Sequence, residues 1–447
     1  MVEGTQNKLS DGWMIGVSQP YRSIKSDKIN PFGGINYVLD KFDAHLAGPI
    51  DEFLGLRSTS FGYQYSHIIC AIISVFLSGG SCMEDLNLYL KDLLVERPGT
   101  RVPSADTVLR GISELATDNI SYSAERSGNT YDFNTGGNLN ELLIRTLLAT
   151  GQLERGKSYD VDFDHMFLKA EKYDAKRTYK HFDGYRPGVV TIGGLIVYIE
   201  NADGNTNVRF MQAETLRRFF ELMKRLGIGI RSFRADCGSY SEDIVKVIME
   251  YTDKFYIRAE RCDSLYGKVT RQQGWTEVEI GFQKCELQSF PFEGFKDVRH
   301  CRSVVQRQRI KEGTEIDLFD GEYTYRSILT SDWDKTDEEV ILHYNDRGAS
   351  EQVFDVQNND FGWAHLPKSF MNENTVFMIL TAIAANFYRF IVSIPLMAFL
   401  FGVEATARVK RFVFRFITVP AKWVRIGRQN VLNIYTERPY DILFAHG

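Results

Sequence analysis

Residues 157–167 read KSYDVDFDHMF, a stretch in which polar and apolar side chains alternate. A period of two residues is typical of a β-strand whose two faces have different surroundings. Residues 188–200, GVVTIGGLIVYIE, predict two more strands that meet at the glycine pair. A β-sheet is therefore expected to begin here, with the carboxylates of Asp160, Asp162 and Asp164 on one face of its first strand.

Helices and strands alternate after this point. Apolar residues recur at steps of three and four over residues 213–226, which predicts a helix packed on the sheet. A strand at 230–235, a helix near 244–251 and a strand at 254–258 follow. The order β-β-β-α-β-α-β matches the ribonuclease H-like topology, in which helices flank a mixed sheet. We therefore predict an α/β fold with a ribonuclease H-like catalytic core.

The whole chain has 447 residues, of which 44% are hydrophobic and 25% are charged, a globular composition. Its length suits roughly two to three domains. Five regions are expected: a helical N-terminal domain for DNA binding or dimerisation at 1–150, the first part of the core at 151–263, a β-rich insertion at 264–337, a helical completion of the core at 338–401 and a basic tail at 402–447. Within the first region, Ser104 is predicted to cap a helix, and the polar residues 121–138 are predicted to form a linker or exposed loop.

Charge is distributed unevenly along the chain. The formal net charge is −5 and the pI is near 6.0, which argues against a protein that coats nucleic acid. Residues 405–430, however, contain no acidic residue and carry Arg408, Lys410, Arg411, Arg415, Lys422, Arg425 and Arg428. This segment is expected to bind the DNA backbone, so the acidic total is compatible with binding through a local patch.

The cellular compartment is inferred from the cysteines and the apolar runs. The six cysteines lack metal-binding spacing, which favours a reducing compartment. No secretory signal pattern is found in the first residues, so a cytoplasmic protein is expected. The apolar run 376–401 is interrupted by Asn386, Arg389 and Pro395, and we interpret it as a buried helix rather than a membrane span.

Three acidic positions are candidate ligands of a divalent metal ion. Asp162 lies on the first strand, Asp236 follows the fourth strand, and Glu351 lies on a helix expected after the insertion. Tyr344, Arg347 and Glu351 stand at i, i+3 and i+7, so they share one stripe of that helix. Each feature also has an ordinary structural explanation, namely an exposed edge strand, a turn cap and a surface ion pair.

Clustered carboxylates would suit one kind of chemistry in particular. Two Mg²⁺ ions about 3.5–4 Å apart can activate an attacking oxygen and stabilise a leaving oxygen in a displacement at phosphorus. Asp and Glu supply the hard oxygen ligands that this chemistry needs, and neither His nor Cys is required.

Several short motifs resemble those of the DDE transposases of bacterial insertion sequences. The spacing of Tyr344, Arg347 and Glu351 is similar to the Y-R-E signature of the branch that carries a β-rich insertion. More closely, the chain resembles the insertion-sequence family thirteen-eighty, over residues 100–430, in the motifs DVD at 160–162, GYRP at 184–187, RAD at 234–236, YNDRGASEQ at 344–352 and VPAK at 419–422.

This resemblance implies roles for individual residues. It implies that Asp162, Asp236 and Glu351 bind the metal ions and that Tyr344 and Arg347 contact phosphates. The family usually has Thr two residues after the first aspartate, whereas this chain has Asp164. The register of the motif therefore leaves Asp160 as an alternative to Asp162.

The resemblance also implies an activity and its partners. It implies a bacterial, nucleoid-associated DNA transposase that uses Mg²⁺, for which Mn²⁺ can substitute, to cut at terminal inverted repeats and to join the ends to target DNA. Double-stranded DNA and a second copy of the chain are the expected partners, with no membrane. Two alternatives remain: a ribonuclease H-like nuclease or recombinase without transposition, and a non-catalytic DNA-binding regulator.

Overall fold

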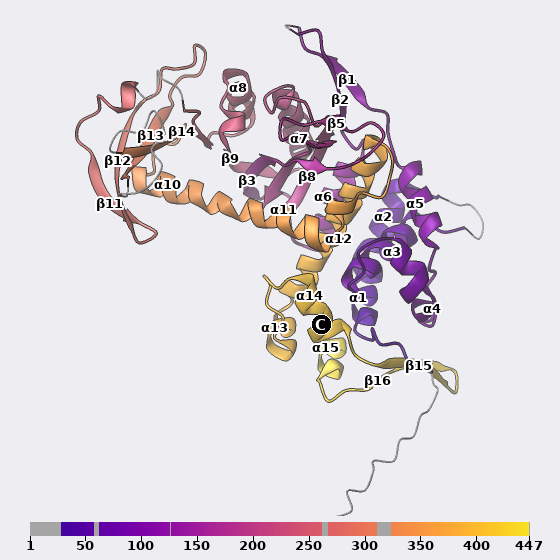
Figure 1. Cartoon of the computed structure of the whole chain (residues 1–447). Coiled ribbons are helices and arrows are strands. Elements are labelled where there is room, and N and C mark those ends of the chain that lie inside the picture. Colours follow the sequence, from indigo (N-terminus) through magenta and orange to yellow (C-terminus); the bar gives the residue numbers. More distant parts are fainter. Residues whose placement is uncertain (1–27, 58–61, 126, 262–266, 311–322, 447) are drawn as a thin grey trace, which may run out of the picture.

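The computed structural model describes residues 28–57, 62–125, 127–261, 267–310 and 323–446, apart from the side chains of residues 349–351 and 446. One large mixed sheet runs through these residues, with helices packed on it and a mainly helical part beside it (Figure 1). In spatial order its strands are β1 (Ile120–Ser123), β2 (Thr130–Asn134), β8 (Leu195–Ala202), β7 (Gly188–Ile192), β3 (Ser158–His165), β9 (Gly229–Ala235), β10 (Phe255–Arg258), β14 (Tyr323–Thr330), β13 (Arg302–Arg309), β12 (Gln283–Pro291) and β11 (Thr276–Ile280).

The five strands around β3 are those predicted from residues 157–258. β9 and β10 run parallel to β3, whereas β7 is antiparallel to β3 and to β8. Helix α7 (Gln212–Arg225) joins β8 to β9, and α8 (Glu242–Tyr251) joins β9 to β10. The predicted order of these strands and helices is therefore confirmed, and β3 lies between β7 and β9.

The two faces of β3 have opposite character. Val161 and Phe163 are buried in an apolar core with Phe219 of α7 and Ile248 of α8. Burying such a side chain contributes about 1.5–3 kcal/mol, so the apolar residues decide which face of the strand turns inward. Because successive side chains of a strand alternate, the aspartates of β3 point to the opposite face of the sheet.

The β-rich insertion extends the main sheet. β14 pairs antiparallel with β10, and β11 to β14 form an antiparallel series. Helix α10 (Asp337–Asn345) follows, and its Val340 and Ile341 pack with Tyr256 of β10 and Val304 of β13. Since Phe255 and Ile257 face α8, Tyr256 faces the same side as the aspartates. Helix α10, which follows the insertion, thus lies on the face of the sheet that carries the aspartates of β3.

The predicted linker or loop at residues 121–138 is mainly a β-hairpin. β1 pairs with β2, and β2 pairs with β8 at the edge of the sheet. The prediction was wrong because only Phe133 and Asn134 are buried in these two strands, so the hairpin has almost no apolar pattern.

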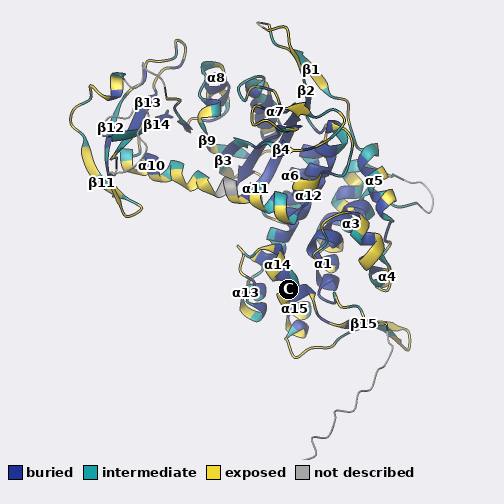
Figure 2. Cartoon of the chain, in the orientation of Figure 1, coloured by how far each residue is buried: buried dark blue, intermediate teal, exposed yellow. Residues whose placement is uncertain are grey.

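The apolar run forms α12 (Met371–Ser393) and α13 (Pro395–Phe401). α12 packs against β8, α6 (Leu139–Ala149) and α3 (Tyr65–Leu77), and Figure 2 shows most of it as buried. Among the described residues it is the one helix long and apolar enough to cross a membrane, but 89% of its apolar window is buried inside the protein. The interpretation as a buried helix is therefore confirmed.

The helical part combines segments from both ends of the described chain. It includes α1 (Ile35–Phe42), α2 (Gly48–Leu54), α4 (Lys91–Leu94) and α5 (Ala105–Glu114), together with α3. As predicted, Ser104 caps α5, because its hydroxyl accepts a hydrogen bond of 3.3 Å from the backbone N of Thr107. Helix α12 links this part to the sheet.

Residues 402–446 are folded, although a basic tail was expected there. They form α14 (Val409–Phe412), a π-helical turn (Val413–Ile417), β15 (Ala421–Ile426), β16 (Gln429–Ile434) and α15 (Tyr440–His446). Phe412 and Phe416 are buried in the same core as α1 and α3. Asn30 and Ala421 exchange two backbone hydrogen bonds of 2.9 and 2.8 Å. The segment was expected to be a tail because most of its cationic side chains are exposed, whereas Phe412 and Phe416 are buried among residues distant in the sequence.

Candidate functional site

The carboxylate-bearing face of β3 meets the end of β9 at the candidate site. The parallel register sets Asp162 opposite Arg234. Two residues further along each strand, Asp164 comes beside Asp236, whereas Asp160 lies two residues earlier. Only the last of the three aspartates on β3 therefore has a carboxylate as its neighbour on β9.

Asp162 is buried and fully engaged by Arg234. The Nε and Nη2 atoms of Arg234 donate to the two carboxylate oxygens of Asp162 at 2.6 and 2.8 Å. The side chains of Asp162 and Arg234 are 5% and 10% exposed. The remaining Nη1 atom donates at 2.7 Å to the backbone O of His343, in the last turn of α10.

Asp160 has its own arginine, at the surface. Arg231 Nε donates to Asp160 Oδ1 at 2.8 Å, and the Ser232 hydroxyl donates to the same oxygen at 2.7 Å. Partial burial would raise the pKa of Asp160, but the hydrogen bonds from Arg231 and Ser232 hold it at about 2. Asp160 and Asp162 are thus each ion-paired with an arginine of β9.

Asp164 lies between an arginine and a second carboxylate. Arg347 Nη2 stands 2.7 Å from Asp164 Oδ2. Burial, opposed by the charge of Arg347 and reinforced by that of Asp236, raises the pKa of Asp164 to about 6. Asp164 is thus close enough to Asp236 for the two carboxylates to repel each other, and a divalent cation between them would remove that repulsion.

Asp236 is held at the end of β9 by the turn that follows it. Its Oδ1 accepts a hydrogen bond of 2.9 Å from the backbone N of Gly238, which opens a 3-10 turn over Cys237–Ser239. A Cβ at position 238 would stand 2.9 Å from that same oxygen, too close for a non-bonded carbon. The glycine therefore permits the backbone to approach the carboxylate closely.

The expected single helical stripe is interrupted. α10 ends at Asn345, a 3-10 turn covers Asp346–Gly348, and α11 (Ala349–Asp360) begins after it. Asn, Asp and Gly are weak helix formers, which explains the break within YNDRG. Even so, burial raises the pKa of Tyr344, and Arg347 reaches the site described above.

One further contact of Arg347 and the position of Glu351 complete the description of this segment. Arg347 Nη2 donates to the backbone O of Phe163 at 3.4 Å, and within the described chain its Nε has no hydrogen-bond partner. Glu351 lies in the first turn of α11, but its side chain falls outside the described residues. The structure thus brings together Asp164, Asp236 and Arg347, and it places the backbone of Glu351 one helical turn beyond Arg347.

The GYRP motif lies next to the end of β3. Gly184 and Tyr185 belong to β6 (Asp183–Tyr185), which pairs with β4 (Leu168–Lys169) and β5 (Lys176–Arg177). Arg186 is 1% exposed, burial lowers its pKa to about 10, and its Nε and Nη1 have no partner among the described residues. The motif therefore forms structure beside the site, and no hydrogen bond or ion pair of the described residues joins it to Asp164 or Asp236.

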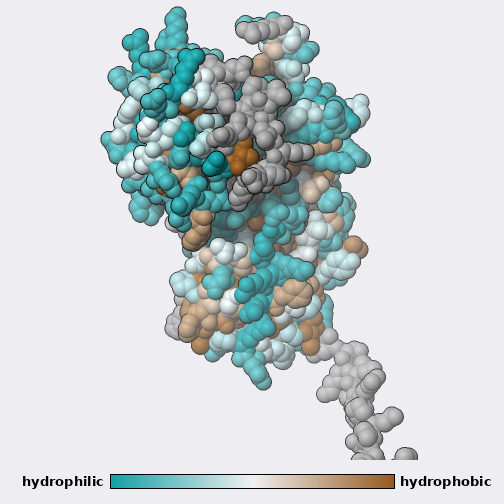
Figure 3. Space-filling view, turned by 60° about the vertical axis from the view of Figure 1, so that its left-hand side comes forward, coloured by the Kyte–Doolittle hydropathy of each residue, from teal (hydrophilic) through white to brown (hydrophobic). Residues whose placement is uncertain are grey.

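The seven cationic residues of 405–430 differ in solvent exposure and in ion pairing. Arg408 forms ion pairs with Asp355 and Asp360 of α11, the second at 2.7 Å, so it anchors the segment. Lys422 is partly exposed. Besides Arg408, which is exposed as well, the exposed members of the group are Lys410, Arg411, Arg415, Arg425 and Arg428. Figure 3 shows this lower part of the molecule as a mixture of hydrophilic and hydrophobic surface.

The residues of the site fit a hard divalent cation. Asp164 and Asp236 bring two oxygen ligands together, and their repulsion favours a cation. Among the side chains that the structure describes, no group of three or more His, Cys, Asp or Glu could hold a metal ion. Glu351, the third acidic residue predicted from the sequence, has a side chain outside that set.

The sequence alone did not identify two features of the site. It offered three aspartates at equal spacing, and the choice among them depends on the register between β3 and β9. It also gave no sign that Arg234 would neutralise Asp162, because the two residues are 72 positions apart. The RAD motif, with an arginine two residues before Asp236, was the one available signal.

Comparison with known proteins identifies the family. The chain matches the protein-family model described as Transposase DDE domain group 1 over residues 57–447. The chain belongs to this family of transposases. A solved structure, the cryo-EM structure of the piggyBac transposase synaptic complex with hairpin DNA, is similar with a TM-score of 0.43 and 10% sequence identity, covering 87% of this chain and 80% of that chain. A search of curated protein sequences finds no match.

Proposed function

We propose that this transposase cuts DNA at the terminal inverted repeats of its own mobile element and joins the freed ends to target DNA in a Mg²⁺-dependent, cut-and-paste reaction. The observation that carries the proposal is the pair of carboxylates, Asp164 and Asp236, at the ends of two adjacent parallel strands. Oxygen ligands of this kind suit Mg²⁺. Membership of a DDE transposase family supports the reaction class.

The finer assignment of fold and branch is part of the same proposal. The order β8-β7-β3-β9-β10, with β7 and β8 antiparallel to their neighbours, supports a ribonuclease H-like core. The strands β11 to β14, which lie between α8 and α11, support a branch with a β-rich insertion before the glutamate. We assign the chain to the insertion-sequence family thirteen-eighty on its motifs.

In this proposal Asp236, Glu351 and an aspartate of β3 would hold the Mg²⁺ ions. The motifs favour Asp162 as the aspartate of β3, with Asp160 as the register alternative, and Asp164, which lies beside Asp236, is a third candidate; each of the three carboxylates is ion-paired with an arginine. Bound Mg²⁺ supplies an activated attacking oxygen and stabilises the leaving oxygen of the phosphodiester; Mn²⁺ is expected to substitute.

The neighbouring residues orient the DNA strand. The guanidinium of Arg347, whose Nε is buried without a hydrogen-bond partner among the described residues, would donate to a phosphate oxygen, because a guanidinium is well suited to phosphate. The hydroxyl of Tyr344, half-buried beside it, contacts the same strand. Both residues position the phosphodiester against the carboxylates and take no part in proton transfer.

Double-stranded DNA is the proposed partner. The exposed cationic residues of α14, the π-helical turn and the β15–β16 hairpin would contact phosphates without reading sequence. A homodimer is proposed because two element ends must be cut in concert. The proposed location is the bacterial cytoplasm, beside the nucleoid, with no membrane partner.

The test is cleavage of a labelled duplex that carries the inverted repeats flanking the gene. We expect Glu351→Gln and Asp162→Asn each to abolish Mg²⁺-dependent cleavage while gel-shift binding of the duplex persists, and Asp164→Asn shows whether Asp164 contributes as well. Glu338→Gln is the matched control, because Glu338 is an exposed glutamate on α10. Full cleavage by either of the first two variants would remove that residue from the site.

The same assay separates the two alternative functions. A nuclease without transposition would cut the duplex but would not join its 3′ end to a target plasmid. A DNA-binding regulator would bind the duplex without any divalent-ion requirement and would give no product. Joined products that depend on Mg²⁺ are therefore the outcome that supports transposition.

A further inference from the structure

We propose that Arg258, at the end of β10, binds a phosphate of the DNA strand next to the phosphate that is cut. No motif of the sequence singles out this residue. The inference rests on the proposed function, because the phosphate belongs to the DNA that the carboxylates would cut.

Arg258 stands at the same end of the sheet as the candidate site. β10 runs parallel to β9, and the register that sets Ile257 opposite Ala235 brings Arg258 beside Asp236. Tyr256 faces the side of the sheet that carries the aspartates, and side chains two residues apart on a strand share a face. Arg258 therefore lies on that face, with Asp236 between it and the aspartates of β3.

Two neighbouring groups also respond to the charge of Arg258. Burial raises the pKa of Tyr344, and the positive charges of Arg347 and Arg258 oppose that rise. Burial and the charge of Asp236 raise the pKa of Cys237, and Arg258 opposes them as well. The guanidinium is therefore close to Tyr344 of α10 and to Cys237, the residue that follows Asp236.

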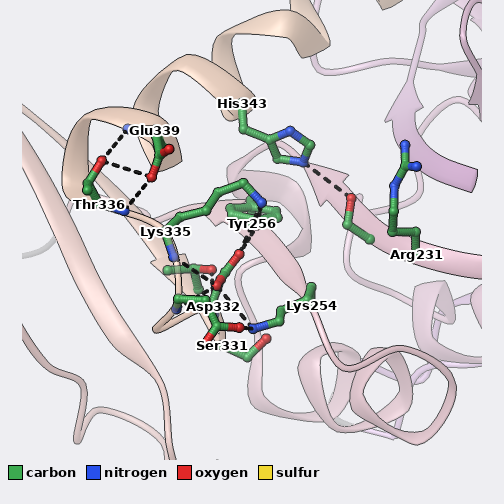
Figure 4. Close-up of polar contacts among 12 residues, drawn as sticks. Arg231, Lys254, Tyr256, Ser331, Asp332, Lys335, Thr336, Glu339 and His343 are labelled. Carbon is green, nitrogen blue, oxygen red and sulfur yellow. Dashed lines mark hydrogen bonds and ion pairs between the residues drawn. The ribbon is translucent and has the colours of Figure 1, made fainter.

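The other cationic side chains around this part of the sheet have acidic partners. Both arginines of β9 are ion-paired with aspartates of β3. Lys254, just before β10, donates to Asp332 at 3.0 Å, and the hydroxyl of Tyr256 donates to the same carboxylate (Figure 4). Lys335 reaches it as well, at 3.3 Å (Figure 4). Asp332 thus neutralises the cations near the start of β10.

Arg258, at the other end of β10, differs from these residues. Its side chain is partly buried, and it makes no hydrogen bond or ion pair with the rest of the described chain. The nearest acidic residue in the sequence, Glu260, binds Arg209 instead, at 2.6 Å. Because a partly buried charge is unfavourable without a counter-charge, the position suits an anionic ligand. A guanidinium is well suited to phosphate.

The place of Arg258 indicates which phosphate it meets. Arg347 contacts the site from the side of β3, whereas Arg258 stands on the other side, over β10. β9 separates these two β-strands, so they are about 10 Å apart. A DNA strand that crosses the ends of the β-strands would present the scissile phosphate to the carboxylates and a neighbouring phosphate to Arg258.

The experiment compares Arg258→Gln and Arg258→Lys with Arg217→Gln. Arg217 is half-buried like Arg258, but it belongs to α7, which packs on the opposite face of the sheet. Each protein is tested on four labelled duplexes. In each duplex an uncharged methylphosphonate replaces one of the two phosphates on either side of the scissile one. The kcat/KM of cleavage with Mg²⁺ and the Kd of gel-shift binding without Mg²⁺ are measured.

On the unmodified duplex we expect Arg258→Gln to lower kcat/KM about ten- to hundredfold, the range lost with a charge-assisted hydrogen bond. Arg258→Lys should lose less, because lysine keeps the charge without the planar fork. At one of the four positions the methylphosphonate should impair the wild type and have little further effect on Arg258→Gln, in kcat/KM and in Kd alike. Arg217→Gln should behave as the wild type on every duplex.

Additive losses at all four positions would overturn the proposal, because a merely structural role of Arg258 would not depend on the charge of one phosphate. Unchanged kcat/KM and Kd in Arg258→Gln would overturn it too. If the glutamine variant folds poorly, Arg258→Lys carries the test, since it should equal the wild type on the one duplex that lacks the contacted charge. If the wild type gives no Mg²⁺-dependent cleavage, the proposed function fails, while the Kd values still decide whether Arg258 binds a phosphate.

Discussion

Asp203 is a buried carboxylate at the end of β8, and replacing it with Asn should stabilise the protein at neutral pH. It is 3% exposed, and its Oδ2 accepts a hydrogen bond of 3.0 Å from the backbone N of Asp132. Burial, opposed by that hydrogen bond and reinforced by the charge of Asp132, raises the pKa of Asp203 from 3.8 to about 6. The amide oxygen of Asn can accept the same hydrogen bond without carrying a charge.

The magnitude follows from the difference between the folded and unfolded pKa values. The folded protein holds the proton on Asp203 more tightly, so the free energy of unfolding decreases as the pH rises from 3.8 to about 6. A difference of about two pKa units corresponds to at most about 3 kcal/mol, reached above pH 7. Well below pH 3.8 both states are protonated, and the wild type and Asp203→Asn should have equal stability.

Urea denaturation at pH 4.5, 6 and 8 measures this difference. The stability advantage of Asp203→Asn should grow from the lowest to the highest pH. Asp118→Asn is the matched control, because Asp118 is exposed and should give no such trend. Two results would refute the idea that Asp203 carries an uncompensated buried charge. One is a stability advantage that does not increase with pH, and the other is a variant less stable than the wild type at pH 8.

Three further predictions concern packing and DNA contact. Gly34→Ala should destabilise the protein, measured as a lower Tm, because a Cβ at Gly34 would stand 2.2 Å from the carbonyl O of Phe416. Trp363→Phe should lower the free energy of unfolding by about 2–4 kcal/mol, since the indole is fully buried and its N–H bonds a threonine hydroxyl at 2.9 Å. Replacing Arg425 and Arg428 together by Ala should weaken binding of random-sequence duplex and reduce the slope of log K against log salt by about 2.

Each of these predictions has a control within the chain. Gly48→Ala should leave the Tm nearly unchanged, because nothing lies within 4 Å of the added Cβ. Thr381→Val tests the hydrogen bond of Trp363 without emptying the core, and it should cost less than the loss of the indole. Equal salt slopes for the wild type and the double arginine variant would show that the β15–β16 hairpin does not touch DNA.

The central fold could be predicted from the sequence because its pattern is local. Phe219, Phe220 and Met223 recur at helical spacing on α7, and the alternation of β3 is visible over eight residues. Both patterns arise because one face of each element is buried in the same core. A segment with one buried face and one exposed face shows this periodicity in its sequence. Its secondary structure can therefore be predicted without knowing which residues it packs against.

The site was only partly predictable because its geometry depends on pairing between distant strands. Asp160, Asp162 and Asp164 are equivalent in the sequence, and they acquire different surroundings only when β3 is aligned with β9. The fold of residues 402–446 was missed for a related reason. Phe412 and Phe416 bury against helices that precede them by more than 300 positions, and no local pattern records such a contact.

The hydrogen bonds between Asn30 and Ala421 bear on how the protein is made. During synthesis the strands β3, β7, β8, β9 and β10 leave the ribosome well before residues 412–421, so the sheet can pair first. Helices α1 and α3, in contrast, must wait with apolar surface uncovered until Phe412 and Phe416 emerge. Contacts of such long sequence separation form slowly, and an uncovered core invites aggregation. A ribosome that stops early would therefore release a chain with an assembled sheet and an unfinished helical part, a natural substrate for chaperones and proteases.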